Sequence, residues 1–147
     1  MPKIKPPYIA ATCLFLAWLL NRLFPNFRII NEPYNKIGIL LVVLGFSSLL
    51  WSFYLFKKNK TPIIPGKKPI FMVIQGPYKF TRNPMYLSVT IILFGVSFYI
   101  GNILGFIAPI IFSLIMSYVF VPFEEKLLEN IFGKKYLEYK KKVRRWV

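Results

Sequence analysis

The longest uncharged stretch of this sequence, residues 84–123, contains no Lys, Arg, Asp or Glu over 40 positions. A helix rises about 1.5 Å per residue, so roughly 20 apolar residues are enough to cross the hydrocarbon core of a bilayer. The stretch is therefore about twice as long as one crossing requires. Gly101-Asn102, near its middle, is a turn signal. We expect two antiparallel helices here, 84–100 and 103–123, that form a hairpin within a membrane.

Two further apolar segments precede the hairpin. Residues 8–24 are apolar except for Asn21 and Arg22 and would form about 26 Å of helix, and the uncharged residues 37–56 would form roughly 30 Å. Lys3 and Lys5 resemble the start of a signal peptide, but no small-residue cleavage site follows them. The sequence therefore predicts an all-α integral membrane protein with four transmembrane helices. We expect one membrane domain over 1–147, divided into two spans (1–56), a loop (57–83), the hairpin (84–123) and an amphipathic tail (124–147).

The positions of the cations predict how this domain is oriented. The formal net charge is +15, and 17 of the 20 Lys and Arg residues lie before the first span, in 57–83 or after residue 123. Cytoplasmic segments of membrane proteins carry such an excess, so we expect a multi-pass protein with both termini and the 57–83 loop in the cytoplasm. Anionic lipid headgroups account for cations beside long apolar segments better than nucleic acid does. Membrane lipids are therefore expected partners, and nucleic acid is not.

The tail has apolar residues at helical spacing on both sides of Gly133, with cations on the opposite face. The apolar positions are Phe123, Leu127, Leu128, Ile131, Phe132, Tyr136, Tyr139, Val143 and Trp146. This pattern predicts a cytoplasmic amphipathic C-terminal helix that lies along the headgroups.

The residue inventory excludes several kinds of chemistry. The chain has no His, no Asp and a single cysteine, Cys13. A Ser-His-Asp triad, a Cys-His pair and a His-ligated metal site are therefore impossible, and no metal is expected. Cys13 lies in an apolar segment, where a cysteine usually packs as a small hydrophobe. The eight glycines form neither GxGxxG nor a phosphate loop, which argues against a nucleotide-binding α/β domain.

Polar side chains collect where the hairpin begins and ends. The turn signal at 75–78 leads through Arg82 and Asn83 into the first helix, and the second helix ends at Glu124 and Glu125. Because antiparallel helices bring these ends to the same side, we expect Arg82 to converge with the acidic pair, and Arg82 and Glu124 could meet. Two adjacent carboxylates at a bilayer boundary need solvent, a partner or a cation. They could simply form salt bridges with nearby lysines, but together with the turn they favour a polar pocket closed by the tail.

These segments resemble a known superfamily. Three blocks carry the resemblance: Gly76-Pro77-Tyr78-x-x-x-Arg82-Asn83-Pro84-x-Tyr86, Glu124-Glu125, and Phe132-Gly133-x-x-Tyr136-x-x-Tyr139-x-x-x-Val143. In residue type and spacing these blocks resemble those of the isoprenylcysteine carboxyl methyltransferases and phospholipid methyltransferases. The resemblance extends over roughly residues 67–147. The resemblance implies an integral membrane methyltransferase that uses S-adenosylmethionine as its cofactor. It also implies a cytoplasm-facing cofactor pocket under the C-terminal helix and a lipid-like or small amphiphilic acceptor that arrives from the bilayer.

By position, the resemblance implies cofactor contacts from an extended segment, from the start of the hairpin and from the acidic pair. The residues are Ile70, Phe71, Met72, Val73, Tyr78, Arg82, Asn83, Pro84, Met85, Tyr86, Glu124 and Glu125. Arg82 would bind the α-carboxylate through two parallel hydrogen bonds, and Glu124 or Glu125 would bind the ammonium. Tyr78 and Tyr86 would cover the adenine and the sulfonium. Asn83 replaces the family's usual His with an amide that does not titrate near neutral pH, and no catalytic residue is assigned.

Several alternatives remain open on sequence alone. In the carboxyl-methylating branch an Arg one turn before the acidic pair contacts the substrate, whereas this chain has Phe120 there. The acceptor could therefore be a prenylcysteine, a phospholipid headgroup, a small thiol or another amphiphile. Two other classes fit the hairpin and tail: an NADPH-dependent, sterol-reductase-like membrane enzyme, and a non-enzymatic membrane protein whose ion pairs are structural. The sequence does not indicate an oligomeric state.

Overall fold

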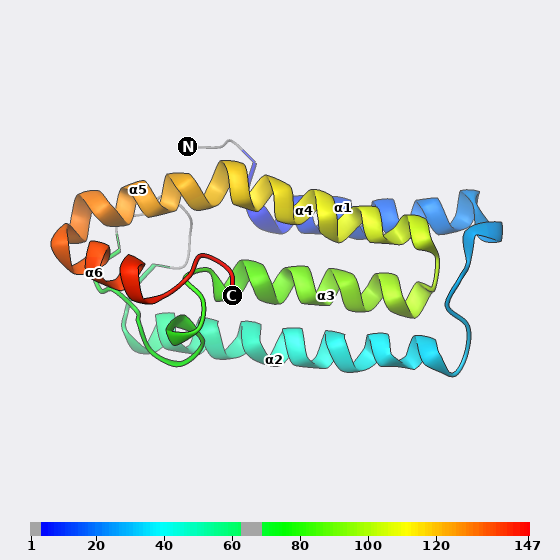
Figure 1. Ribbon diagram of the computed structural model, residues 1–147, viewed down its shortest axis with the longest axis horizontal. Coiled ribbons are helices and arrows are strands. Elements are labelled where there is room, and N and C mark those ends of the chain that lie inside the picture. Colours follow the sequence, from blue (N-terminus) through cyan, green and yellow to red (C-terminus); the bar gives the residue numbers. More distant parts are fainter. Residues whose placement is uncertain (1–3, 63–68) are drawn as a thin grey trace.

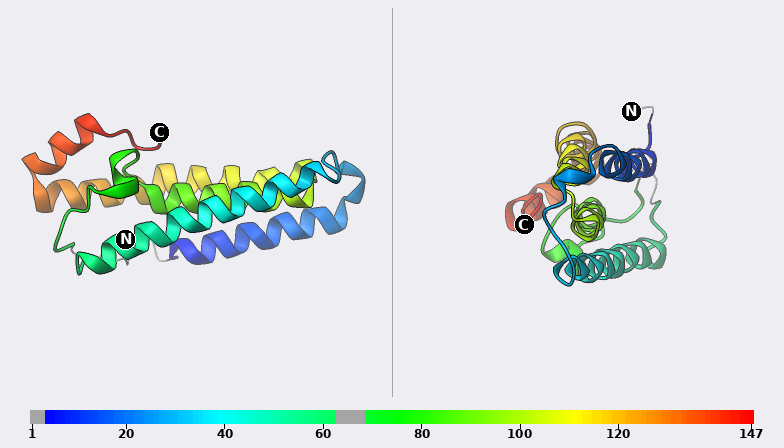
Figure 2. Two further views of the ribbon diagram at one scale, coloured as in Figure 1. Left: turned by 90° about the horizontal axis from the view of Figure 1, so that it is seen from below. Right: turned by 90° about the vertical axis from the view of Figure 1, so that its right-hand side faces the viewer.

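The computed structural model describes residues 4–62 and 69–147, and in these ranges the chain forms an elongated bundle of helices (Figure 1). The end-on view in Figure 2 places α3 in the middle, and α3 packs against α1, α2 and α4. The α-helices are α1 (Pro6–Leu23), α2 (Ile37–Lys58), α3 (Pro84–Ile100), α4 (Ile107–Ile115), α5 (Val121–Phe132) and α6 (Lys134–Lys142). Short 3-10 turns form at Pro25–Phe27, Tyr34–Lys36, Gly76–Lys79 and Ile103–Phe106.

The turn predicted in the middle of the uncharged stretch is present. Gly101 ends α3 in the left-handed conformation, with a φ of 78°, and its N–H bonds to the carbonyl of Ser97. The side chain of Asn102 accepts a hydrogen bond from the N–H of Leu104 and donates one to the carbonyl of Phe24. These bonds join the tip of the hairpin to the loop that follows α1.

The second helix of the hairpin is longer than predicted. It does not end at residue 123 but continues without a break from Ile103 to Phe132. Within this continuous helix, Met116–Phe120 form one turn of π-helix just before Pro122, which has no N–H to donate to the preceding turn. Gly133, with a φ of 50°, then ends the helix, and α6 folds back toward the bundle (Figure 2, left). Glu124 and Glu125 are therefore part of a helix and do not follow its end.

Small residues bring α2 and α3 into close contact. A Cβ atom added to Gly95 of α3 would lie 2.7 Å from the carbonyl oxygen of Gly38 and 2.8 Å from the backbone nitrogen of Val42, both on α2. Gly45, one turn further along α2, likewise has no room for a side chain beside Ser88 and Ile92. Contacts of this kind hold transmembrane helices together where lipid removes the hydrophobic driving force. The hydropathy pattern alone did not reveal them.

The outer surface of the bundle is strongly apolar. Side chains that a soluble protein would bury remain exposed along the helices, among them Phe15, Trp18, Leu40, Phe46, Ile110 and Leu114. Two helices, Tyr34–Lys58 and Ile103–Phe132, are long and apolar enough to cross a bilayer, and Pro84–Ile100 is a shorter apolar helix. The described residues are thus all-helical, as predicted, with two candidate membrane-spanning helices.

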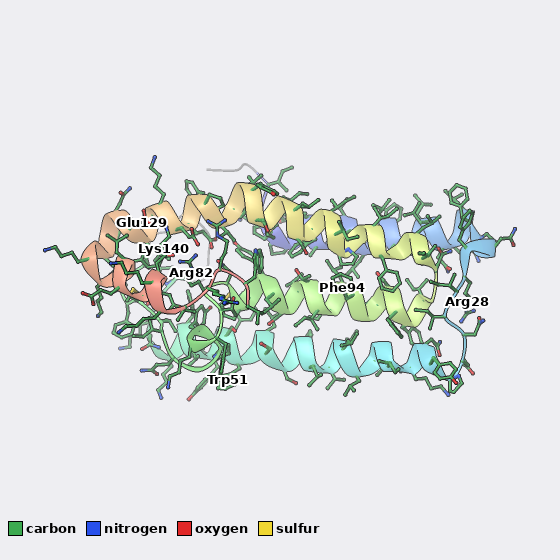
Figure 3. All side chains as sticks on the ribbon, viewed as in Figure 1. Arg28, Trp51, Arg82, Phe94, Glu129 and Lys140 are labelled. Carbon is green, nitrogen blue, oxygen red and sulfur yellow. The ribbon has the colours of Figure 1, made fainter. Side chains whose placement is uncertain are left out.

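The two ends of the bundle differ in charge. Arg28 lies with the loop after α1 at one end, whereas Arg82, Glu129 and Lys140 lie at the other end, with α5 and α6 (Figure 3). The start of α1 and the C-terminus also lie toward the second end (Figure 1). The predicted 57–83 loop is described only in part, because residues 63–68, with Lys67 and Lys68, lie outside the described residues, as does Lys3. Polar and ionic side chains thus concentrate at the end that holds α6.

Candidate functional site

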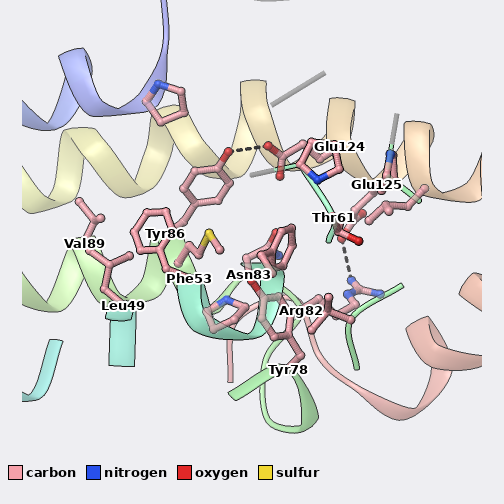
Figure 4. A pocket seen from close by; sticks show the side chains of 18 of the residues that line it. Leu49, Phe53, Thr61, Tyr78, Arg82, Asn83, Tyr86, Val89, Glu124 and Glu125 are labelled. Atoms are coloured by element: carbon pink, nitrogen blue, oxygen red, sulfur yellow. Dashed lines mark hydrogen bonds and ion pairs between the residues drawn. The ribbon is translucent and has the colours of Figure 1, made fainter. Parts of the chain in front are cut away.

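A cavity of about 550 Å³ lies at the α6 end of the bundle (Figure 4). Its walls come from all six α-helices of the described residues and from the segment that leads into α3. Most of the lining is apolar, and the polar side chains are Thr61, Tyr78, Arg82, Asn83, Tyr86, Glu124, Glu125, Tyr136 and Tyr139. A largely apolar cavity with a few convergent polar groups is the usual form of a site for a small molecule.

The structure brings eleven of the twelve predicted cofactor-binding residues to this cavity: Phe71, Met72, Val73, Tyr78, Arg82, Asn83, Pro84, Met85, Tyr86, Glu124 and Glu125. Ile70 is the exception, because its side chain is 76% exposed and does not line the cavity. Several lining residues were not predicted. Tyr136 and Tyr139 belong to the quoted sequence blocks and could have been included, whereas Ala10 and Leu14 of α1 and Phe53 of α2 carry no signal beyond their hydropathy.

The two neighbouring glutamates have different surroundings. Glu125 is 5% exposed and is surrounded by cations. It accepts hydrogen bonds from Nη2 of Arg145 at 2.8 Å and from Nε of Arg145 at 3.2 Å. Nη2 of Arg82 lies 3.0 Å from Oε1 of Glu125, and Nζ of Lys140 lies 3.9 Å from Oε2. Arg82 therefore meets the acidic pair at Glu125 and not at Glu124, the residue predicted to meet it, and the charge of Glu125 is compensated within the protein.

Glu124, by contrast, forms no ion pair among the residues that the structure describes. Its Oε1 accepts a hydrogen bond from the hydroxyl of Tyr86 at 2.6 Å, and its side chain faces the cavity (Figure 4). A half-buried carboxylate is costly without a counter-charge. Glu124 is therefore placed to bind a cationic group of a ligand.

Arg82 is held firmly by the protein around it. Its backbone N–H bonds to the carbonyl of Arg144 at 3.0 Å, and its Nη1 bonds to the carbonyl of Lys140 at 3.3 Å. Nη2 binds Glu125, whereas the buried Nε has no hydrogen-bond partner among the described residues. A buried N–H donor without a partner is unfavourable, so the Nε–H of Arg82 is available for an acceptor atom of a ligand.

Tyrosines form much of the remaining polar lining. The hydroxyl of Tyr139 donates to the carbonyl of Tyr78 at 2.6 Å, and the ring of Tyr78 packs against Phe56 with centroids 5.6 Å apart. Burial raises the pKa of Tyr139 to about 12, although the charge of Arg82 opposes this shift. Burial also raises the pKa of Tyr78 and of Tyr136. These side chains therefore stay neutral near pH 7 and give the cavity aromatic walls without charge.

The fold and the site together define a class of protein. An apolar helical bundle has at one end a cavity with a rigid guanidinium, aromatic walls and a carboxylate that forms no ion pair within residues 4–62 and 69–147. Such a cavity suits a ligand that carries both charges as well as an apolar or aromatic part, bound beside a membrane. These are the features of a membrane-associated protein with a cavity suited to a small molecule.

Comparison with known proteins identifies the family. The family described as "Phospholipid methyltransferase" matches residues 34–135, so the chain belongs to it. The chain is 33% identical over 79 residues to the protein-S-isoprenylcysteine O-methyltransferase of Schizosaccharomyces pombe. The aligned region covers 52% of this chain and 32% of that protein. It is also 43% identical over 63 residues to an uncharacterized protein of Haemophilus influenzae. That aligned region covers 43% of this chain and all of the relative.

These matches confirm the predicted resemblance and class the chain with the membrane methyltransferases. The family match begins before α2, so it includes a helix that the quoted sequence blocks leave out. The chain spans about a third of the length of its fission yeast relative.

Proposed function

We propose that this chain transfers a methyl group from S-adenosylmethionine to a lipid-like or small amphiphilic acceptor at the cytoplasmic face of a membrane. The single observation that carries the proposal is Glu124, a carboxylate that faces the cavity without a cationic partner among the described residues. Membership in the phospholipid methyltransferase family supports the same activity.

The residues around the cavity suit the charged groups of this cofactor. Glu124, steadied by Tyr86, would bind the ammonium group. The α-carboxylate would bind Nε of Arg82, which has no partner among the described residues, whereas Nη1 and Nη2 each contact one protein group, Lys140 and Glu125. Because Nη1 and Nη2 each carry a second N–H, the parallel pair of bonds expected from the sequence stays a prediction. The aromatic and apolar lining, which includes Phe71, Met72, Val73, Tyr78, Pro84 and Met85, would cover the adenine and the sulfonium.

When bound, the cofactor supplies an electrophilic methyl group on a positively charged sulfur. The protein then has to exclude water and align the acceptor, and such orientation contributes as much as ~7–11 kcal/mol to lowering a barrier. The apolar lining serves the first task. A thiolate or carboxylate acceptor needs no base, which agrees with Asn83, whose amide donates to the carbonyl of Arg145 at 2.9 Å and does not titrate.

An opening toward lipid supports an amphiphilic acceptor. Leu14 of α1 and Phe53 of α2 both line the cavity, and both are also exposed, by 38% and 36%. The cavity therefore reaches the apolar outer surface between α1 and α2. We place α1, α2, α3 and the 103–123 part of the second hairpin helix in the bilayer as four spans, with the termini and the 57–83 loop in the cytoplasm. The opening then faces lipid acyl chains.

The first test is thermal stabilisation of the detergent-purified protein. S-adenosylhomocysteine at about 100 times its Kd should stabilise the fold by about 2.7 kcal/mol, which corresponds to roughly 5–10 °C in Tm for a chain of this size. 5′-Methylthioadenosine, which lacks the amino-acid part, should give a much smaller shift, because it cannot bind Glu124 or Arg82. Stabilisation by NADPH alone would instead indicate a reductase. No shift in Tm with S-adenosylhomocysteine or with NADPH would indicate a non-enzymatic protein.

A second prediction concerns the opening. Leu14→Trp should reduce transfer of labelled methyl groups into a total lipid extract or a long-chain alkyl thiol by about tenfold, because the larger ring fills the space between α1 and α2. Stabilisation by S-adenosylhomocysteine should be unchanged. Phe15→Trp is the matched control, since Phe15 is exposed but does not line the cavity. Equal transfer by the two variants would show that the acceptor does not enter here.

A further inference from the structure

The last five residues, 143–147, fold back from α6 toward the start of α3 (Figure 1). We refer to them as the C-terminal segment. Its backbone carbonyls accept three hydrogen bonds from the residues just before α3. The N–H of Arg82 bonds to the carbonyl of Arg144 at 3.0 Å, and Thr81 Oγ1 and Asn83 Nδ2 bond to that of Arg145 at 3.0 and 2.9 Å. The C-terminal segment is thus joined to the part of the chain that carries Arg82.

A side chain of the C-terminal segment makes a second connection. Arg145 binds both oxygens of Glu125, the same carboxylate that binds Nη2 of Arg82. Two guanidinium groups therefore share one buried carboxylate, and each fixes the position of the other through it. Two parallel bonds from Arg to a carboxylate set its orientation as well as its distance.

The end of the C-terminal segment is anchored by an apolar contact. Trp146 is half-buried and packs against the core cluster that contains Phe112, Met116 and Phe120. The segment is therefore held at three kinds of contact: backbone carbonyls, the Arg145 ion pair and the Trp146 ring. Of the groups that hold the segment, Arg82, Asn83, Glu125 and Phe112 line the cavity, whereas no residue of the C-terminal segment itself does.

We infer that Arg145 is a positioning residue, which holds Arg82 in its cofactor-binding orientation through Glu125 and so makes the C-terminal segment part of the methyltransferase site. This inference rests on the proposed function. The two glutamates then have different roles: Glu124 binds the ligand, and Glu125 connects Arg82 to the C-terminal segment. Asn83 also has a role in this arrangement, because its amide donates a hydrogen bond to the carbonyl of Arg145 in the same segment.

The test compares two neighbouring arginines in the full-length chain. The side chain of Arg144 is exposed and forms no ion pair among the described residues, so Arg144→Ala is a matched control for Arg145→Ala. Binding of S-adenosylhomocysteine is measured by calorimetry at a temperature at which every variant is folded. Arg145→Ala should weaken binding about tenfold, Arg145→Lys should weaken it less, and Arg144→Ala should leave it unchanged. Equal affinity of the Arg145→Ala and Arg144→Ala variants would overturn the inference.

A second readout follows the C-terminal segment directly. With Trp18 and Trp51 replaced by Phe, fluorescence comes from Trp146 alone, and acrylamide quenching reports its exposure. Quenching should rise in Arg145→Ala but not in Arg144→Ala. If the parent protein binds no S-adenosylhomocysteine, the proposed function fails, and quenching then decides the inference: a rise confined to Arg145→Ala supports the connection through Glu125, and no rise overturns it.

Discussion

Replacing Glu124 with glutamine should weaken binding of S-adenosylhomocysteine by about 100-fold while leaving the protein folded. The amide of glutamine can still accept the hydrogen bond from Tyr86, so the local structure is preserved. What is lost is the negative charge opposite the ammonium of the ligand. Truncating one partner of a buried charge pair costs about 2–5 kcal/mol, and each 1.4 kcal/mol is a factor of ten in affinity.

The control for this prediction is Glu138→Gln, which removes the same charge from the exposed face of α6, where Glu138 forms no ion pair among the described residues. Calorimetric titration of both variants and of the wild-type protein gives the comparison. Unchanged affinity in Glu124→Gln would remove the observation on which the proposed function depends. Equal losses in the two variants would show that the effect is a long-range change in net charge.

The sequence predicted the helical hairpin well, because two local features determine it. Forty residues without a charge set the length of two crossings, and Gly101 supplies the left-handed residue that the turn requires. It predicted the end of the second helix less well. The first charges, at Glu124 and Glu125, suggested that the helix stops there, but helical hydrogen bonding continues to Gly133, where a glycine permits the chain to turn. The first charged residues of a helix indicate where it leaves the hydrocarbon core of a bilayer, and the helix itself can continue beyond them.

The sequence predicted those parts of the candidate site that lie at the two ends of the hairpin, because both ends of a hairpin lie on the same side. Arg82 and Glu125 meet for this reason. The separate surroundings of Glu124 and Glu125 were not predictable, because they depend on Arg145, which reaches the site only after α6 folds back. The contribution of α1 to the cavity was hidden for a different reason: Ala10 and Leu14 are ordinary apolar residues in an apolar helix, and only tertiary packing gives them a place in the lining.

Packing between α2 and α3 leads to a prediction with a large effect on stability. Gly95→Ala should lower the free energy of unfolding by about 3 kcal/mol, or roughly 6–12 °C in Tm, because the added methyl group meets backbone atoms that cannot move aside. Those atoms are the carbonyl oxygen of Gly38 at 2.7 Å and the nitrogen of Val42 at 2.8 Å. Since α2 and α3 both line the cavity, the same change should also weaken cofactor binding as the helices separate.

Gly105→Ala separates this packing effect from the general effect of replacing glycine. A Cβ atom at Gly105 would lie 3.7 Å from the side chain of Ser97, which is an ordinary van der Waals contact, so its Tm should change little. Alanine favours an α-helix over glycine by about 1 kcal/mol, so at Gly95 helix propensity acts against the predicted loss. Thermal unfolding of both variants in the same detergent measures the difference. If Gly95→Ala were as stable as Gly105→Ala, α2 and α3 would not be held together by direct backbone contact at this point.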